Sequence, residues 1–130
     1  MKFHLKQPPR EFTIGDPANP ITLRDCGALE LAPDEQVTFV GSNHLEYDVV
    51  RKTWGFYATP SVNGRLGNFG LRTALAKSTS GKYYVLLLEA GKEAEFNQYL
   101  HLERMHVVCW LDDQASLDKL DKTFATPNAD

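Results

Sequence analysis

The stretch YYVLLLEAGKEAEFNQYLHLERMHVVCWL, residues 83–111, decides the fold. Residues 83–89 are almost continuously apolar, which predicts a central strand covered on both faces. From Lys92 to Arg104 the apolar residues recur at helical spacing, so a helix is expected there. Residues 106–111 are apolar again and predict another strand. A strand, a helix of roughly a dozen residues and a second strand have the spacing of a crossover, so the two strands are expected to be parallel.

The chain before this unit alternates between apolar and polar residues, as strands do. The alternation predicts strands within residues 21–31, 36–40, 45–57 and 71–75. Within 45–57 the apolar positions change face after Val49, so a bulge or a strong twist is expected between Val49 and Thr53. The sequence therefore predicts an α+β fold, a twisted and mostly antiparallel sheet of about six strands with one packed helix over residues 92–104.

Both ends of the chain have a different character. Residues 1–20 contain Pro8, Pro9, Pro17 and Pro20, and proline fixes φ and lacks an N–H donor. An extended, irregular, Pro-rich arm is expected there, with stretches that could lie along a sheet edge. Residues 21–113 are expected to form a single α+β domain. The chain from Asp112 onward is acidic and has three apolar residues at near-helical spacing, which predicts a C-terminal helix or a flexible tail over residues 114–130.

Composition excludes several classes of protein. The chain has 130 residues and a formal net charge of -3, so one ordinary domain is expected, and nucleic acid and membranes are disfavoured as partners. Its longest apolar run, residues 83–88, is far shorter than the roughly 20 residues a membrane span needs. Cys26 and Cys109 lie in apolar segments and are interpreted as buried thiols, which fits a reducing compartment and a cytoplasmic location. No cofactor is expected.

The segment from Trp54 to Arg72, WGFYATPSVNGRLGNFGLR, concentrates aromatic residues, glycines and arginines. Asn63 is expected to cap a short helical turn that ends with Gly70 as its C′ residue. Unpaired N–H groups at such a turn attract anions, arginines add bidentate contacts, and aromatic rings can stack on a ligand. The candidate ligand-binding residues are Arg51, Trp54, Tyr57, Asn63, Arg65 and Arg72. The alternative is a structural corner, in which Pro60 turns the chain and the arginines pair with Glu46 or Asp48.

His44, Glu46 and Asp48 share one face of an expected strand. An imidazole beside two carboxylates could perform acid–base chemistry, which makes His44 and Tyr57 the candidate catalytic residues. Alternating polar residues also describe any solvent-facing side of a strand. The four histidines form no metal-binding motif, so no metal site is expected.

The segments WGFYATPS, NGRL, KYYVLLLEAG and VVCWLDD carry a resemblance. Over roughly residues 35–113 the chain resembles a small family of uncharacterised bacterial proteins. The resemblance implies a bacterial origin and a single small domain. It implies no activity, and no functional residue can be transferred from it.

Two classes of function follow from these residues. The first is a small non-enzymatic binding module that uses residues 54–72 to bind an anionic small molecule or a partner protein, and self-association is also plausible for such a surface. The second is a small enzyme acting on a phosphorylated or nucleotide-linked sugar or metabolite. An enzyme should gather His44, Tyr57 and Arg65 around a deep pocket, whereas a protein-binding module should show an exposed apolar patch.

Overall fold

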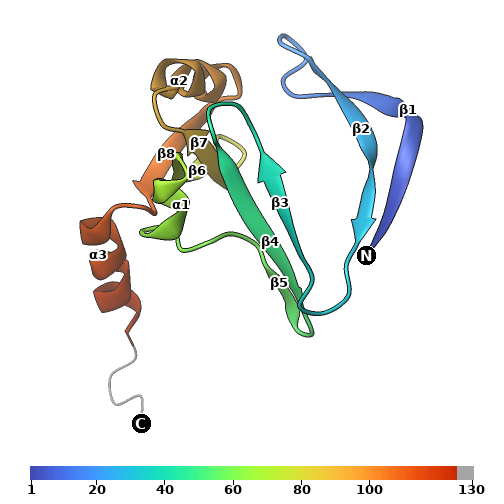
Figure 1. Cartoon of the computed structure of the whole chain (residues 1–130). Helices are drawn as coiled ribbons and strands as arrows, with labels where there is room; N and C mark the ends of the chain where they lie inside the picture. Colours follow the sequence, from blue (N-terminus) through green and yellow to red (C-terminus); the bar gives the residue numbers. More distant parts are fainter. Residues whose placement is uncertain (126–130) are drawn as a thin grey trace. The chain divides into compact units, whose positions relative to one another are not determined.

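A computed structural model of the chain describes residues 1–125 (Figure 1). The chain divides into two compact units. Unit 1 consists of Met1–Phe39 and Asp48–Ala58, and unit 2 of Val40–Tyr47 and the described residues from Thr59 onward. The described residues form three antiparallel sheets together with helices, which confirms the α+β class. The expected single sheet is wrong, because its strands are shared among the three small sheets, and the unit boundaries differ from the domain limits at residues 20 and 113.

The first sheet of unit 1 pairs β1 (Lys2–Ile14) with β2 (Ile21–Glu30). Residues 1–20 were expected to form an extended, irregular arm with stretches along a sheet edge. Most of them form this strand, so the extended course is confirmed and the irregular one is wrong. The pairing is interrupted between Leu5 and Arg10, and both Pro8 and Pro9 lie in the interruption. Proline cannot donate to a ladder, so the strand accommodates both residues where the ladder is open.

The second sheet has the order β3-β4-β5, with β3 at Gln36–Val40, β4 at Glu46–Lys52 and β5 at Gly55–Tyr57. The single strand expected over residues 45–57 is therefore a hairpin, in which Lys52 pairs with Gly55 around a two-residue turn. The pairing of β4 with β5 runs from Val50 to Lys52 without a register shift, so this pairing contains no bulge. Every residue of β4 is half-buried, so both of its faces carry apolar side chains.

The sheet of unit 2 has the order β7-β6-β8, with β6 at Leu71–Ser78, β7 at Tyr83–Glu89 and β8 at Met105–Trp110. Both outer strands are antiparallel to β6, so β7 and β8 run in the same direction, as the crossover predicted. The helix between them, α2, spans Glu93–Leu102 and confirms the expected helix. The central strand is β6 rather than β7, because β7 lies at an edge and its first residues are exposed.

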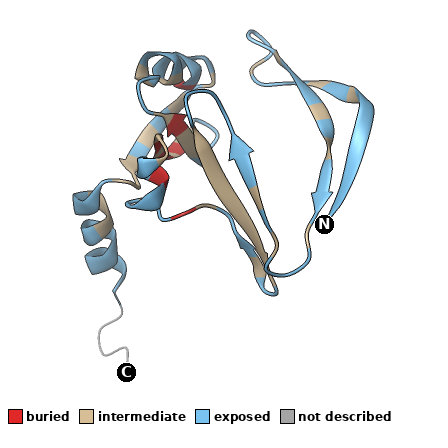
Figure 2. Ribbon diagram, in the orientation of Figure 1, coloured by how far each residue is buried: buried red, intermediate tan, exposed pale blue. Residues whose placement is uncertain are grey.

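The buried core lies in unit 2 (Figure 2). Its apolar members come from α1, β6, β7 and α2: Leu66, Leu71, Ala74, Ala76, Leu88 and Leu100. The side chain of Thr73 is buried among them. Unit 1, all of whose residues are described, contains no buried residue. The two units therefore differ in how their apolar side chains are covered.

Two further helices belong to unit 2. Helix α1, Arg65–Asn68, has Gly64 rather than Asn63 at its N-cap, and the Ser61 hydroxyl accepts the Arg65 N–H at 2.8 Å. A serine four residues upstream therefore takes the role expected of Asn63. Gly70 follows the C-cap with a φ of 86°, which confirms its C′ assignment.

Helix α3, Gln114–Phe124, is capped by Asp113, whose carboxylate accepts the Ser116 N–H at 3.0 Å. The helix confirms that alternative for the C-terminal segment over residues 114–124. The flexible tail expected after it falls on residues 126–130, outside the described residues.

Candidate functional site

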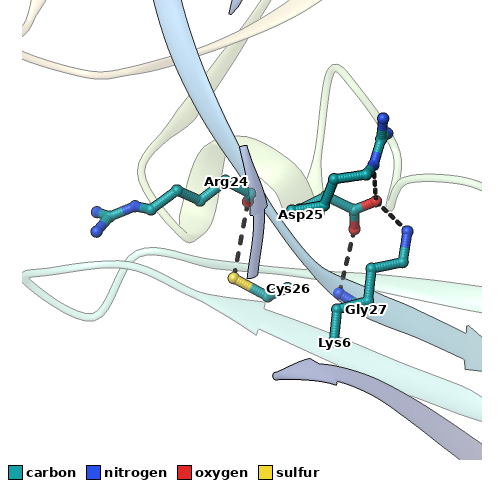
Figure 3. Close-up of polar contacts among 6 residues, drawn as sticks. Lys6, Arg24, Asp25, Cys26 and Gly27 are labelled. Carbon is teal, nitrogen blue, oxygen red and sulfur yellow. Dashed lines mark hydrogen bonds and ion pairs between the residues drawn. The ribbon is translucent and has the colours of Figure 1, made fainter. Parts of the chain in front are cut away.

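The interruption in the β1–β2 ladder holds a cluster of charged side chains (Figure 3). The Lys6 ammonium lies 2.5 Å from Asp25 Oδ2, and Arg10 Nε lies 3.6 Å from the same oxygen. Asp25 Oδ1 accepts the Gly27 N–H at 3.2 Å. The hydrogen bond from Lys6 and the one from Gly27 hold the pKa of Asp25 below its usual range. Asp25 is therefore charged at neutral pH and already neutralised by its own neighbours.

Gly27 makes the close approach of the two strands possible. Its φ is +145°, and a Cβ at this position would overlap the backbone carbonyl oxygen of His4. Neighbouring Cys26 is exposed, and its thiol lies 3.7 Å from the Arg24 carbonyl oxygen. The expectation of two buried thiols is wrong for Cys26, because nothing within the two-stranded sheet covers that side chain.

An open, mostly apolar groove of about 520 Å³ lies beside this cluster and belongs wholly to unit 1. We call it the unit 1 groove. Its apolar lining includes residues from β1 to β5 and from the chain after β2: Phe3, Leu29, Leu31, Val37, Val49 and Phe56. Its polar lining includes Arg24 and Asp25, and Cys26 contributes to the wall. A concave, mainly apolar surface with a few polar groups is the usual form of a binding site.

The two charged residues of the groove differ in what they contact. Asp25 is held by Lys6 and Arg10. The Arg24 guanidinium forms no ion pair within residues 1–125, and its side chain extends away from the Asp25 cluster (Figure 3). The groove lining therefore includes one positively charged side chain without an ion pair among the described residues, and Glu11 is its register partner on β1.

Three residues of the expected ligand site belong to unit 1. The Arg51 guanidinium donates to the carbonyl oxygens of Lys52 and Gly55, the latter at 2.8 Å, and lies over the Phe56 ring at 5.3 Å. Arg51 thus braces the β4–β5 turn. Trp54 and Tyr57 are exposed on this hairpin and do not line the groove.

The other three residues belong to unit 2. Asn63 Nδ2 donates to Gln114 Oε1 at 3.1 Å, and the Arg65 guanidinium lies 4.8 Å from the centre of the Phe69 ring. Arg72 Nε donates to Asp112 Oδ2 at 3.1 Å, and its guanidinium lies 3.9 Å from the Trp110 ring centre. Each of these side chains therefore has a partner within unit 2, although Arg72 pairs with Asp112 rather than with the expected Glu46 or Asp48.

The candidate catalytic residues lie in different units. His44 is exposed in the β3–β4 turn of unit 2 with a φ of 61°, and Tyr57 belongs to unit 1. Asp48 accepts a hydrogen bond from the Thr38 hydroxyl at 2.7 Å.

Among residues 1–125, no group of three or more His, Cys, Asp and Glu side chains is placed to hold a metal ion. No helix in this part of the chain is long and apolar enough to cross a membrane.

Comparison with models of protein families, with curated proteins and with solved structures gave no match. The unit 1 groove was not predicted from the sequence. Six of its lining residues lie within residues 24–31, but the others come from four further strands outside this window. The alternation of apolar residues within the first arm, beginning with Phe3 and Leu5, was the one signal that this segment forms part of a sheet.

Proposed function

We propose that this chain is a non-enzymatic binding module whose unit 1 groove receives an apolar segment of a partner protein. One observation carries the proposal: unit 1 holds large apolar side chains around a groove but buries none of its residues. Contiguous exposed apolar surface on a folded protein commonly marks an interaction site.

The energetic argument rests on the aromatic residues of the groove. Phe3 is 57% exposed and Phe56 is 56% exposed, although both line a concave surface. Full burial of one such side chain is worth about 1.5–3 kcal/mol relative to full exposure. A bound segment that covers both rings therefore gains a large part of this burial free energy, which unit 1 alone does not gain because both rings stay exposed.

Charge defines the chemistry of the occupant. Arg24 lines the groove without an ion pair within the described residues, whereas Asp25 is already neutralised. An arginine pairs best with a carboxylate, which it can bind bidentately. The matching segment is therefore apolar and carries one Asp or Glu beside its apolar residues.

The groove supports this function better than the alternatives drawn from the sequence. An anionic small ligand held by the expected site, residues 51–72, would have to compete with Asp112 for Arg72 and with backbone carbonyls for Arg51. The enzyme alternative, acting on a phosphorylated or nucleotide-linked metabolite, gains nothing from a groove that neither His44 nor Tyr57 lines. We place the protein in the cytoplasm, where the exposed thiol of Cys26 stays reduced.

A library of random peptides displayed on phage tests the proposal, with the full chain as bait. The enriched peptides should share apolar residues with one Asp or Glu. Their affinity should fall at least tenfold in Phe56→Ala and in Arg24→Ala. Trp54→Ala is the matched control, because Trp54 lies in the adjacent turn but outside the groove lining, and binding should persist in it.

The position of the bound peptide is read from the thiols. Cys26 lines the groove and is exposed, so a bound peptide should slow its reaction with a maleimide, while the rate at Cys109 should not change. Enriched peptides that bind Phe56→Ala as tightly as the natural protein, or that leave the reactivity of Cys26 unchanged, would refute the assignment of the groove.

A further inference from the structure

The outer edge of β7 in unit 2 lacks a partner strand within the described residues. The alternation of hydrogen-bonded pairs between β6 and β7 shows which backbone groups of β7 point toward this outer edge. Ser78 N–H donates to the Lys82 carbonyl at 2.9 Å, and Ala90 N–H donates to the Gly70 carbonyl at 2.8 Å. Because hydrogen-bonded pairs alternate along an antiparallel ladder, the even-numbered residues of β7 bond to β6. The backbone groups of its odd-numbered residues face outward: Tyr83, Val85, Leu87 and Glu89.

This edge also lacks the features that usually prevent pairing between chains. Residues 83–88 contain no charge and no proline, and the register with β6 is unbroken along the whole strand. Tyr83 is 57% exposed and Val85 is 60% exposed. A regular, apolar and exposed edge strand is a template for another strand unless it is covered.

The opposite edge of the same sheet is protected. The pairing of β6 with β8 shifts register between Leu75 and Ala76, which leaves Val108 as an extra residue on β8. Such a bulge bends and twists a strand, so β8 does not present a regular edge with which a strand of another chain could pair. The contrast within one sheet assigns the pairing surface to β7.

We infer that two copies of this chain associate by antiparallel pairing of their β7 strands, which joins the two sheets of three strands into one continuous sheet. In an antiparallel pair of strands, residues opposite each other project their side chains to the same face of the sheet. A two-fold axis between two copies of β7 therefore passes between the two copies of one residue, which lie opposite each other. If that residue is Leu86, the two strands pair along their entire length. This register places Val85 opposite Leu87 and Tyr83 opposite Glu89, so outward backbone groups meet outward groups.

Charge complementarity favours a second copy as the occupant of this edge. In this register apolar residues face apolar residues along the middle of the strand, and no two like charges stand opposite each other. The only charged residue of β7, Glu89, faces a tyrosine whose hydroxyl can donate to a carboxylate. The strand is therefore complementary to itself and needs no other sequence to complete the pair.

Sedimentation velocity of the full chain tests the inference. The natural protein should dimerise in a concentration-dependent manner, and Val85→Lys should weaken the dimer at least tenfold by placing a charge in the interface. Val108→Lys is the matched control, because it adds the same charge to an exposed valine on the bulged edge, and its dimer should persist. A monomeric natural protein, or a dimer that Val108→Lys disrupts and Val85→Lys does not, would overturn the inference.

A cysteine pair tests the register and does not depend on how well Val85→Lys folds. In a Cys26→Ser, Cys109→Ser background, Leu86→Cys places two thiols across the axis in a non-hydrogen-bonded pair. Its Cα atoms should be about 4.5 Å apart, which a disulfide can span. Mild oxidation should give a disulfide-linked dimer for Leu86→Cys and little for Val108→Cys. Equal cross-linking of both variants would refute β7 pairing.

Discussion

The hydroxyl of Thr73 offers a sharp test of the unit 2 core. Thr73 is fully buried in the central strand β6, and its Oγ1 has no hydrogen-bond partner among the described residues. A buried hydroxyl without a partner costs about 1–3 kcal/mol on the scale of protein mutational data. Thr73→Val keeps the branched shape and replaces the hydroxyl with a methyl group, so it removes this cost.

The expected gain in the free energy of unfolding for Thr73→Val is about 1–2 kcal/mol, since surrounding atoms relax around the new methyl group. A gain of that size raises the melting temperature by roughly 3–10 °C for a chain of this length. Urea denaturation followed by circular dichroism measures the change directly, and the denaturant slope should stay constant because the surface exposed on unfolding is the same.

Thr38→Val is the control for the chemistry of this substitution. The Thr38 hydroxyl donates to Asp48 at 2.7 Å, so its removal should lower stability by about 0.5–1.5 kcal/mol. Opposite signs for the two variants are required. If Thr73→Val destabilises the protein as much as Thr38→Val does, the Thr73 hydroxyl has a partner and the account of this core is wrong.

Two further predictions concern the β1–β2 cluster of unit 1. Gly27→Ala should lower stability by about 1–3 kcal/mol because of its positive φ and the approach of the facing strand. The control Gly67→Ala, in a helix with open space around the new Cβ, should be neutral or gain about 0.5–1 kcal/mol in the same denaturation assay. Lys6 and Gly27 lower the pKa of Asp25 in the folded state. The charged carboxylate therefore stabilises the fold at every pH above the pKa that Asp25 has in the unfolded chain. This contribution is lost as the pH falls through the lower pKa of the folded state. Asp25→Asn should therefore lower the urea midpoint at neutral pH and have a diminishing effect below pH 3.8; a penalty that is constant with pH would contradict this.

The crossover of unit 2 could be predicted because its signal is local and long. Residues 83–111 pass from a continuous apolar run to helical spacing and back, and each run is long enough to determine one element. The sequence did not reveal that β7 lies at an edge. An apolar run is equally compatible with a central strand and with an edge strand, and only the pairing order of the strands distinguishes them.

The β4–β5 hairpin escaped prediction for a different reason. Its turn, Thr53–Trp54, lacks the Asn-Gly or Asp-Gly pair that usually marks a two-residue hairpin. Gly55 after the turn, with a φ of 151°, was the only local indication. The change of apolar face after Val49 predicted a bulge or a strong twist, because half-burial on both faces of β4 cannot be read from one strand alone.

The candidate site shows a further limit of sequence reasoning. Arg72 and Asp112 are 40 positions apart in the chain, yet they form an ion pair at 3.1 Å. The sequence singled out the arginines of residues 51–72, but it could not show that Arg72 is matched by the carboxylate of Asp112. It likewise gave no reason to single out Arg24, which lines the unit 1 groove without an ion pair among the described residues.

If the proposed peptide binds the unit 1 groove, its binding should add to the stability of unit 1, which contains no buried residue. A ligand that binds only the folded state adds about 2.7 kcal/mol of stability when present at 100 times its Kd. In a unit without a buried core of its own, such a gain is a large fraction of what holds the strands together. Backbone amides of β1 and β2 should therefore exchange with solvent much more slowly once a groove-binding peptide is added. Unchanged exchange in the presence of a bound peptide would show that the β1–β2 sheet is stable without its occupant.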